Sequence, residues 1–339
     1  MTDETPPAPT HPRKALFDAD DTAPALPVCD HYCGVEARMR KSLDLQAELG
    51  PVFDVTLDCE DGAPVGGEAA HAHLVAELAL SAANRHGRVG ARVHPVGHAS
   101  FADDLHTLVG RAGARLAYLM VPKPRDFAEV DRACTEIDRQ SAAAGLARPI
   151  PVHVLVETHG ALREVEAIAA HPRIESISFG LMDFVSAHRG AIPASGMSAE
   201  GQFTHPLVVR AKLAIAAACH ARAKVPSHCV VTEFADLRAL EAAARRASRE
   251  LGYTRMWSIH PSQIRPIVDA FAPSAAEVDQ AIEIIDAAQA AGWAPTRQRD
   301  TLHDRASYRY FWQVLERAQR TGQPLPAEVR ERYFAAVPA

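Results

Sequence analysis

The chain has 339 residues, of which 47% are apolar and 6% are aromatic, and its formal net charge is −6. This length fits one large domain with an appendage or two modest domains, and the apolar fraction is enough to bury a sizeable core. The negative charge gives no reason to expect nucleic acid as a partner. No apolar run is long enough to cross a bilayer and no N-terminal stretch resembles a secretory signal, so we expect a cytoplasmic protein without a membrane partner.

Residues 1–25 are rich in proline and acidic residues and have little apolar periodicity, which predicts a mobile N-terminal tail or a surface arm. Beyond them, short runs of apolar, β-branched residues alternate with Ala-rich stretches that have helical periodicity. The apolar runs predict strands over 27–33, 52–57, 90–93, 116–121, 152–156, 174–179, 228–232 and 256–259. Intervening helices are predicted over 162–170, 208–223 and 237–251.

About eight strand–helix units over about 250 residues are typical of a (β/α)8 TIM barrel, which we expect over residues 26–272. An open, doubly wound sheet would need a Gly-rich phosphate loop after an early strand, and the sequence has none. After the barrel the pattern is purely helical, with helices predicted over 275–291 and 308–321 and a polar connector over 296–305. The α/β barrel is therefore expected to carry a C-terminal helical extension or lid over 273–339.

The six cysteines do not form the pattern of a disulfide framework in a chain of this length. Cys29 and Cys33 flank His31, but no second cysteine pair follows at a zinc-finger spacing. We therefore expect reduced thiols in or near the first strand.

Polar residues follow most of the predicted strands, at the end of a TIM barrel where catalytic groups gather. They are Asp58, Glu60 and Asp61 in LDCEDG, Arg92 and His94 in ARVHP, Lys123 in VPKPR, Glu157 in VLVETHGAL, Asp183 in ISFGLMDF, and His260 and Gln263 in SIHPSQI. A single charged residue after a strand is usually a solvated loop residue or a helix cap. Glu157 is different, because it follows a continuous apolar run that should lie inside the barrel.

The combination of these residues indicates a particular chemistry. Two strand-end carboxylates offer the hard oxygen ligands that Mg²⁺ prefers, with coordination positions left for water and substrate. A planar guanidinium suits the two oxygens of a carboxylate or keto acid. Such a site would stabilise an enolate or alkoxide while a carbon–carbon bond breaks or forms.

At these positions the sequence resembles the HpcH/HpaI aldolase and citrate lyase superfamily, on its citrate lyase β-subunit and malyl-CoA lyase side. The most specific match is SIHPSQI at 258–264, followed by FAPS at 271–274 and a helix of the AxEVxxAxxI kind. LDCEDG, ARVHP, LVETHGAL and SFGLMDF follow the family's order, and the similarity covers about residues 50 to 320.

The resemblance implies that Glu157 and Asp183 are ligands of Mg²⁺, that Arg92 binds the oxygens of a keto acid, and that Asp61 holds metal-bound water or orients the site. Lys123 and His260 are expected to contact substrate. In malyl-CoA lyase-like relatives, a C-terminal segment of a neighbouring subunit covers the site and delivers an aspartate. Asp304 is the candidate here, with Asp300 second, although an aspartate before Arg-Ala-Ser is also an ordinary helix N-cap.

The sequence also departs from the family in three places. The first strand region, VCDHYCGVEARMRKS, lacks the Arg-Ser pair that helps family members to hold CoA. His94 stands where the family often has Asn, and the Gly-rich approach to the C-terminal aspartate is missing. The resemblance therefore reaches the metal and keto-acid half of the site more directly than the CoA half.

The function implied by the resemblance is that of a Mg²⁺-dependent carbon–carbon lyase. It would cleave or form a short 3-hydroxyacyl-CoA, such as malyl-CoA or citryl-CoA, with acyl-CoA and a 2-keto acid as the other side of the reaction. The alternatives are a malyl-CoA-type thioesterase, an aldolase acting on free hydroxy-keto acids, and a citrate lyase subunit that needs an acyl-carrier partner. The resemblance and an aromatic stripe predict a homo-oligomer, a trimer or a hexamer; the stripe is Tyr308, Tyr310, Phe311, Trp312 and Leu315. The alternative is that this stripe packs on the barrel of its own chain.

Overall fold

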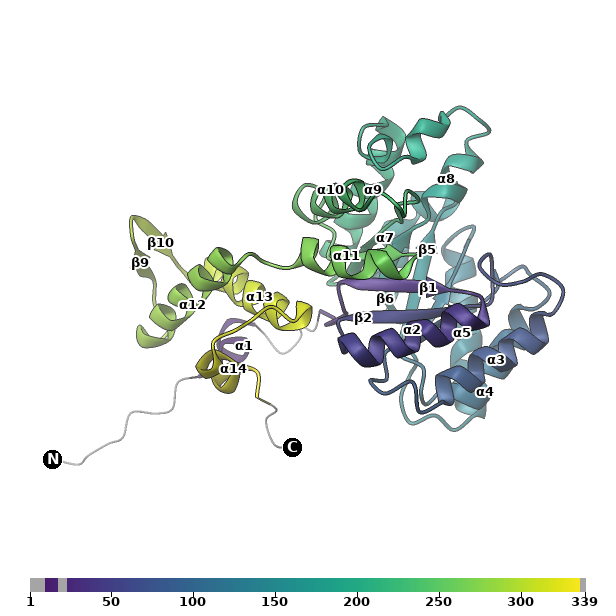
Figure 1. Cartoon of the computed structure of the whole chain (residues 1–339), viewed down its shortest axis with the longest axis horizontal. Helices are drawn as coiled ribbons and strands as arrows, with labels where there is room; N and C mark the ends of the chain where they lie inside the picture. The colour runs from purple at the N-terminus through teal and green to yellow at the C-terminus, as the bar shows by residue number, and fades with distance from the viewer. Residues whose placement is uncertain (1–9, 18–22, 336–339) are drawn as a thin grey trace. The chain divides into compact units, whose positions relative to one another are not determined.

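The computed structural model of the chain describes residues 10–17 and 23–335, which fall into two compact units (Figure 1). One unit spans Ala23–Phe271, where the sequence predicts a barrel over 26–272. The other combines the N-terminal residues with the chain from Ala272 onward. No helix in the described part of the chain is long and apolar enough to span a membrane.

The first unit is a closed barrel of eight parallel strands in sequential order, which confirms the predicted TIM barrel. The strands are β1 (Cys29–Cys33), β2 (Phe53–Asp58), β3 (Val89–Arg92), β4 (Leu119–Val121), β5 (Val152–Val156), β6 (Ile174–Phe179), β7 (Val225–His228) and β8 (Arg255–Ser258). Nearly every strand residue is buried, as expected where helices cover a parallel sheet on its outer face and side chains fill its interior.

The position predicted for the seventh strand, 228–232, is wrong. Strand β7 pairs with β6 through Val225, Pro226 and Ser227, before the apolar run that the pattern selects. Pro226 and Ser227 hide this strand from an apolar-run criterion, whereas Val231 is fully buried in the loop that follows. Burial of an apolar run here reflects loop packing and not strand pairing.

Helices follow the strands around the barrel. They are α2 (Glu36–Leu49), α3 (Glu68–Leu80), α4 (Phe101–Ala112), α5 (Phe127–Ala143), α6 (His159–Arg163), α7 (Val165–Ala170), α8 (Leu181–Ala187), α9 (Pro206–Ala221), α10 (Leu237–Arg249) and α11 (Ile264–Phe271), with 3-10 turns η1 (Ala194–Met197), η2 (Gly201–Phe203) and η3 (Pro261–Gln263). The single helix predicted over 162–170 is two helices. Glu164 interrupts it with a non-helical backbone, and its carboxylate accepts a hydrogen bond from the Phe127 backbone N–H.

The barrel interior contains a buried charge network near the amino ends of its strands. Arg255, at the start of β8, lies 2.5 Å from Asp54 on β2 and 3.2 Å from Asp30 on β1, and all three side chains are fully buried. Tyr118 donates a hydrogen bond to Asp30 and covers Gly90, where an added Cβ would lie 2.3 Å from the Tyr118 ring. The barrel is therefore closed between its first and last strands by charges as well as by backbone pairing.

The second unit contains α1 (Pro12–Leu16), α12 (Ala275–Ala290), β9 (Thr296–Gln298), β10 (Thr301–His303), α13 (Arg305–Thr321) and α14 (Ala327–Tyr333). Leu16, Trp312 and Leu315 are buried in its own apolar core. The connector predicted over 296–305 therefore contains a β-hairpin.

The N-terminal tail predicted over 1–25 is also different in part. Residues 12–16 form α1, because Pro12 starts the helix, His11 caps it and Leu16 packs into the core of the second unit. Residues 1–9 and 18–22 of that prediction lie outside the described residues.

Candidate active site

The carboxyl ends of the barrel strands bring the predicted polar residues to one rim. Arg92 is the last residue of β3, Glu157 directly follows β5, and Asp183 lies in the first turn of α8 after β6. Lys123, two residues after β4, connects them: its ammonium lies 2.6 Å from Asp61 and 3.7 Å from Asp183, and its backbone N–H donates to Glu157 at 2.9 Å. The structure thus gathers five of the sequence-predicted site residues into one cluster.

Arg92 is held in a fixed orientation by two buried carboxylates. Its Nε donates to Asp58 Oδ1 at 2.7 Å, and Nη1 lies 3.0 Å from Glu60 Oε2. Its guanidinium carbon is 4.8 Å from the centroid of the Tyr32 ring. Burial opposes the charge, but Tyr32 and Asp58 raise the pKa of Arg92 well above its ordinary value. Asp58 pairs with Nε and Nη2 and Glu60 pairs with Nη1, but each terminal nitrogen carries a second N–H, so a charged, oriented guanidinium still has donors for a substrate oxygen.

Lys123 is the counter-ion of the acidic rim. Besides Asp61 and Asp183, its ammonium contacts Glu60 Oε1 at 2.6 Å. Although partial burial acts against it, hydrogen bonds to Asp61 and Glu60 raise the pKa of Lys123. The residue has a left-handed backbone with φ of 49°, which is uncommon outside glycine and points to a conformation imposed by its surroundings.

Glu157 and Asp183 have the properties of a divalent-metal site. The Glu157 carboxyl group is buried, and burial together with the negative charge of Asp183 raises its pKa well above the ordinary value. An added Cβ on Gly180 would lie 2.2 Å from Glu157 Oε2, so glycine leaves room for this carboxylate. A bound cation would compensate for two neighbouring carboxylates of which one is desolvated.

The described residues contain no group of three or more His, Cys, Asp or Glu side chains that could hold a metal by themselves. Mg²⁺ is often bound by only one or two carboxylates, with waters and substrate as its remaining ligands. The donor set of Glu157 and Asp183 therefore fits Mg²⁺ and does not suit a closed structural metal site.

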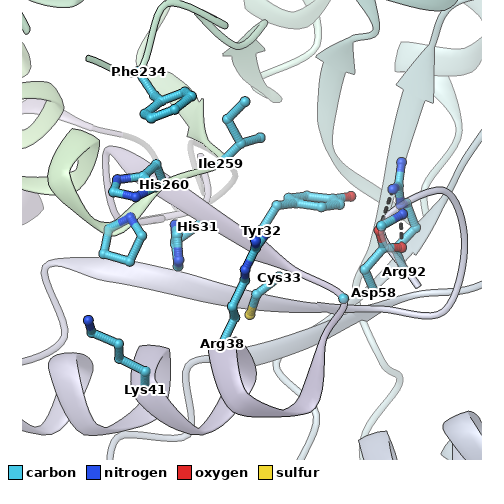
Figure 2. Close-up of a pocket in the computed structure, with 13 residues that line it drawn as sticks. His31, Tyr32, Cys33, Arg38, Lys41, Asp58, Arg92, Phe234, Ile259 and His260 are labelled. Atoms are coloured by element: carbon cyan, nitrogen blue, oxygen red, sulfur yellow. Dashed lines mark hydrogen bonds and ion pairs between the residues drawn. The ribbon is translucent and has the colours of Figure 1, made fainter. Parts of the chain in front are cut away.

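A pocket of about 610 Å³ opens beside Arg92 (Figure 2). It is lined by His31, Tyr32, Cys33, Gly34, Arg38, Lys41, Asp58, Gly62, Arg92, Phe234, Ile259, His260 and Pro261. Figure 2 shows Arg92 paired with Asp58 at one side of the pocket and Lys41, on α2, at the other. The pocket thus joins a charged inner end to a basic outer wall.

Two histidines of the pocket have different environments. His31 is buried, its Nδ1 lies 2.9 Å from Ser258 Oγ, and burial and the nearby His260 lower its pKa to about 4. A neutral imidazole is therefore expected at physiological pH. His260 is at the rim, where it caps η3 and stacks on Phe234 with the ring centroids 5.3 Å apart.

Several pocket residues were not foreseen from the sequence. Arg38 and Lys41 lie three residues apart on α2, a spacing that puts both exposed cations on one helix face. Phe234, 54% exposed, lies in the loop after β7. The spacing of Arg38 and Lys41 in the helix after the first strand is a signal that the sequence contains. The exposure of Phe234 has no such signal, because it depends on the folded loop.

The predicted Asp304 belongs to the second unit. Its carboxylate accepts hydrogen bonds from the backbone N–H groups of Ala306 and Ser307 and so caps α13. Asp300 pairs with Arg297 at 2.7 Å in the hairpin. His94, a departure from the family pattern, bonds to Asp104 at 2.7 Å through its ring.

The chain is similar to several known proteins. Residues 52–261 match the family model described as HpcH/HpaI aldolase/citrate lyase. The chain is 32% identical over 231 residues to the L-malyl-CoA/beta-methylmalyl-CoA lyase of Cereibacter sphaeroides, which covers 64% of this chain and 71% of that protein. Among solved structures, a citrate lyase from Burkholderia xenovorans LB400 is 54% identical with a TM-score of 0.83, and the match covers 96% of this chain and 99% of that one.

A further structure, the protein CitE from Mycobacterium tuberculosis in complex with magnesium and pyruvate, is 25% identical with a TM-score of 0.58. That match covers 74% of this chain and 92% of the other.

Proposed function

The chain belongs to the HpcH/HpaI aldolase/citrate lyase family, and we propose that it is a Mg²⁺-dependent lyase acting on a short 3-hydroxyacyl-CoA thioester. Cleavage would break the carbon–carbon bond between the hydroxyl-bearing carbon and the carbon next to the thioester. The products would be an acyl-CoA and a 2-keto acid. The observation that carries this proposal is the pocket, because a carboxylate-binding guanidinium lies at its inner end and two cations lie at its outer wall.

Arg92 and the two acidic strand-end residues form the keto-acid half of the proposed site. Glu157 and Asp183 would hold Mg²⁺, which supplies a Lewis acid for the oxygens of the substrate. Arg92, oriented by Asp58 and Glu60, would bind the carboxylate of the departing keto acid. The similar CitE protein was solved with magnesium and pyruvate, which supports a site for a divalent metal and a keto acid in the proposed function.

Lys123 and Asp61 have a supporting role in this proposal. The Lys123 ammonium bridges Glu60, Asp61 and Asp183, so it holds the acidic loop after β2 against the metal-binding carboxylate of α8. Asp61 would thus orient the site through Lys123.

The outer pocket wall forms the CoA half of the proposed site. Arg38 and Lys41 are exposed cations on one face of α2, suited to the phosphate groups of CoA. Phe234, Ile259 and His260 offer an apolar and aromatic wall for the pantetheine arm or the adenine ring. These residues would replace the Arg-Ser pair that the first strand lacks, and the named activity of the Cereibacter sphaeroides relative on CoA thioesters is consistent with this.

A panel of 3-hydroxyacyl-CoA thioesters with and without Mg²⁺ tests the function. Free thiol and keto acid are measured separately in each reaction. A lyase releases keto acid without free thiol, and removal of the metal with a chelator abolishes that release. Free thiol without keto acid would instead identify a thioesterase, and cleavage of free hydroxy-keto acids alone would identify an aldolase.

A further inference from the structure

Tyr32, next to Arg92, has a buried hydroxyl group. The residue is on β1, is 7% exposed and lines the pocket beside Arg92. Its phenol oxygen has no hydrogen-bond partner among the residues that the structure describes. Buried tyrosine hydroxyls are normally hydrogen-bonded, so an unpaired one on a residue that lines a pocket calls for a ligand.

The Tyr32 ring is held in place by its neighbours. It stacks on Trp257 of β8 with the centroids 4.4 Å apart and an interplanar angle of 21°. The indole N–H of Trp257 donates to Ser178 Oγ on β6 at 2.9 Å, which fixes the indole in turn. Together with the Arg92 guanidinium, these contacts set the direction of the hydroxyl before any substrate binds.

Figure 2 shows Tyr32 between Lys41 on α2 and the Arg92–Asp58 pair. In the proposed function, CoA phosphates lie at the Lys41 side and the keto acid at the Arg92 side. The thioester group, which joins the CoA arm to the reacting carbons, then falls at Tyr32.

We propose that Tyr32 is a catalytic residue whose hydroxyl donates a hydrogen bond to the thioester carbonyl oxygen of the substrate. The inference rests on the proposed lyase function. As the substrate hydroxyl loses its proton, its oxygen becomes the keto oxygen and the carbon–carbon bond breaks. The electron pair of that bond passes to the thioester as an enolate, whose charge lies largely on the carbonyl oxygen. A proton added to the enolate carbon completes the acyl-CoA, so protons balance and no oxidant is needed.

The environment of the phenol suits a donor. Burial raises the pKa of Tyr32 well above its ordinary value, with Arg92 acting in the opposite direction, so the hydroxyl keeps its proton at neutral pH. A donor placed where negative charge develops stabilises the transition state more than the ground state.

The variant Tyr32→Phe tests the role, because it keeps the ring, the stack on Trp257 and the contact with Arg92. We expect kcat for thioester cleavage to fall about 100-fold, as for other oxyanion-binding donors. The melting temperature and the dissociation constant of free CoA should stay at wild-type values. The rate at which the enzyme exchanges the acyl-CoA α-protons with deuterated solvent should fall with kcat, since it reports on the enolate alone.

A matched control is Tyr253→Phe, which removes a buried hydroxyl that donates to the Lys212 carbonyl away from the pocket. It should leave kcat unchanged. Wild-type kcat in Tyr32→Phe, or a loss of kcat explained by a lower melting temperature or weaker CoA binding, would overturn the catalytic role. A wild-type enzyme that releases keto acid from no thioester would instead overturn the proposed function, a result visible before any variant is made.

Discussion

At the scale of single residues, the candidate site is a set of charges that hold one another in place. Arg92 is fixed by Asp58 and Glu60, and Glu60 also contacts Lys123. Because each cation contacts at least two carboxylates, replacing one side chain changes the orientation of several. Function and stability should therefore respond differently to substitutions that keep a charge and to those that keep a shape.

Arg92→Lys keeps the charge and loses the planar fork. The ammonium can pair with Asp58 but cannot at the same time reach Glu60 and a substrate carboxylate in the guanidinium geometry. We expect turnover to fall about 100-fold and the melting temperature to change far less. Steady-state kinetics with thermal unfolding checks this, and kinetics near wild type would refute the role of Arg92.

Glu157→Gln keeps the shape and loses the charge. In the proposed site it removes half of the carboxylate pair that holds Mg²⁺, so titration calorimetry should detect little Mg²⁺ binding and turnover should be lost. The metal-free protein should be no less stable than the wild type, because the substitution removes a buried carboxylate. Unchanged Mg²⁺ affinity would show that Glu157 is not a ligand.

At the scale of secondary-structure elements, α9 packs a lysine behind the barrel wall. Lys212 is fully buried, donates to Gln202 Oε1 at 2.7 Å and lies 4.1 Å from the centroid of the Phe203 ring. Burial lowers its pKa to about 8, with Cys229 acting in the opposite direction. The folded state therefore resists protonation of this amine.

The sign of the pH dependence follows from that shift. The ordinary pKa of a lysine amine is 10.5, so above that pH the amine is neutral in both the folded and the unfolded state and does not affect the free energy of unfolding. As the pH falls from 10.5 toward about 8, the amine is protonated in the unfolded state first, and the free energy of unfolding decreases. Below about 8 this decrease is complete. We expect Lys212→Met to stabilise the protein by about 1–3 kcal/mol near neutral pH, and this gain should disappear at alkaline pH. Urea unfolding at several pH values measures it, and a gain that did not vary with pH would contradict the explanation.

Asp304, the candidate proton donor, lies between the β9–β10 hairpin and α13. Its cap on α13 can be kept by Asn, which caps about as well as Asp. Asp304→Asn should therefore keep the melting temperature, and it should lose most of the lyase rate if the carboxylate, supplied by a neighbouring subunit, exchanges a proton with the acyl-CoA. Full activity in this variant would leave Asp304 as a cap only and move the search to Asp300 or Asp61.

At the scale of the whole molecule, the sequence predicted the barrel well because short segments with several apolar residues alternate regularly with helical segments. The apolar residues of VHVLV and ISFGL predict the two strands that precede Glu157 and Asp183. Motif order likewise identified Arg92. The acidic residues of LDCEDG identified the end of the second strand as part of the site. The ion pair between Asp58 and Arg92 could not be predicted from them.

What the sequence could not give depends on contacts between distant segments. The unpaired hydroxyl of Tyr32 becomes visible only when β1, β3 and β8 are assembled. Strand β7 was misplaced because Pro226 and Ser227 carry its pairing. Arg255 was left outside the eighth strand, since a charged residue in a buried parallel strand contradicts the apolar pattern that predicts such strands.

We expect the molecule to form a homo-oligomer, a trimer or a hexamer. Most of the aromatic stripe on α13 is used within its own unit, where Tyr308, Trp312 and Leu315 are buried. Tyr310 and Leu302 remain 55% and 72% exposed and are candidates for contacts between subunits. Light scattering at micromolar concentration checks the prediction, a monomer would end it, and Leu302→Asp should weaken the assembly without unfolding the chain.

The buried charge network of Asp30, Asp54 and Arg255 affects how the chain folds as it leaves the ribosome. Asp30 and Asp54 are made early, on the first two strands, whereas Arg255 is made with the last. Until residue 255 emerges, a nascent barrel would enclose Asp30 without its guanidinium partner, which is costly. The strands synthesised first therefore gain little by closing early, and completion of the barrel awaits the eighth strand. Truncated chains that end before β8 should accumulate as open, protease-sensitive forms.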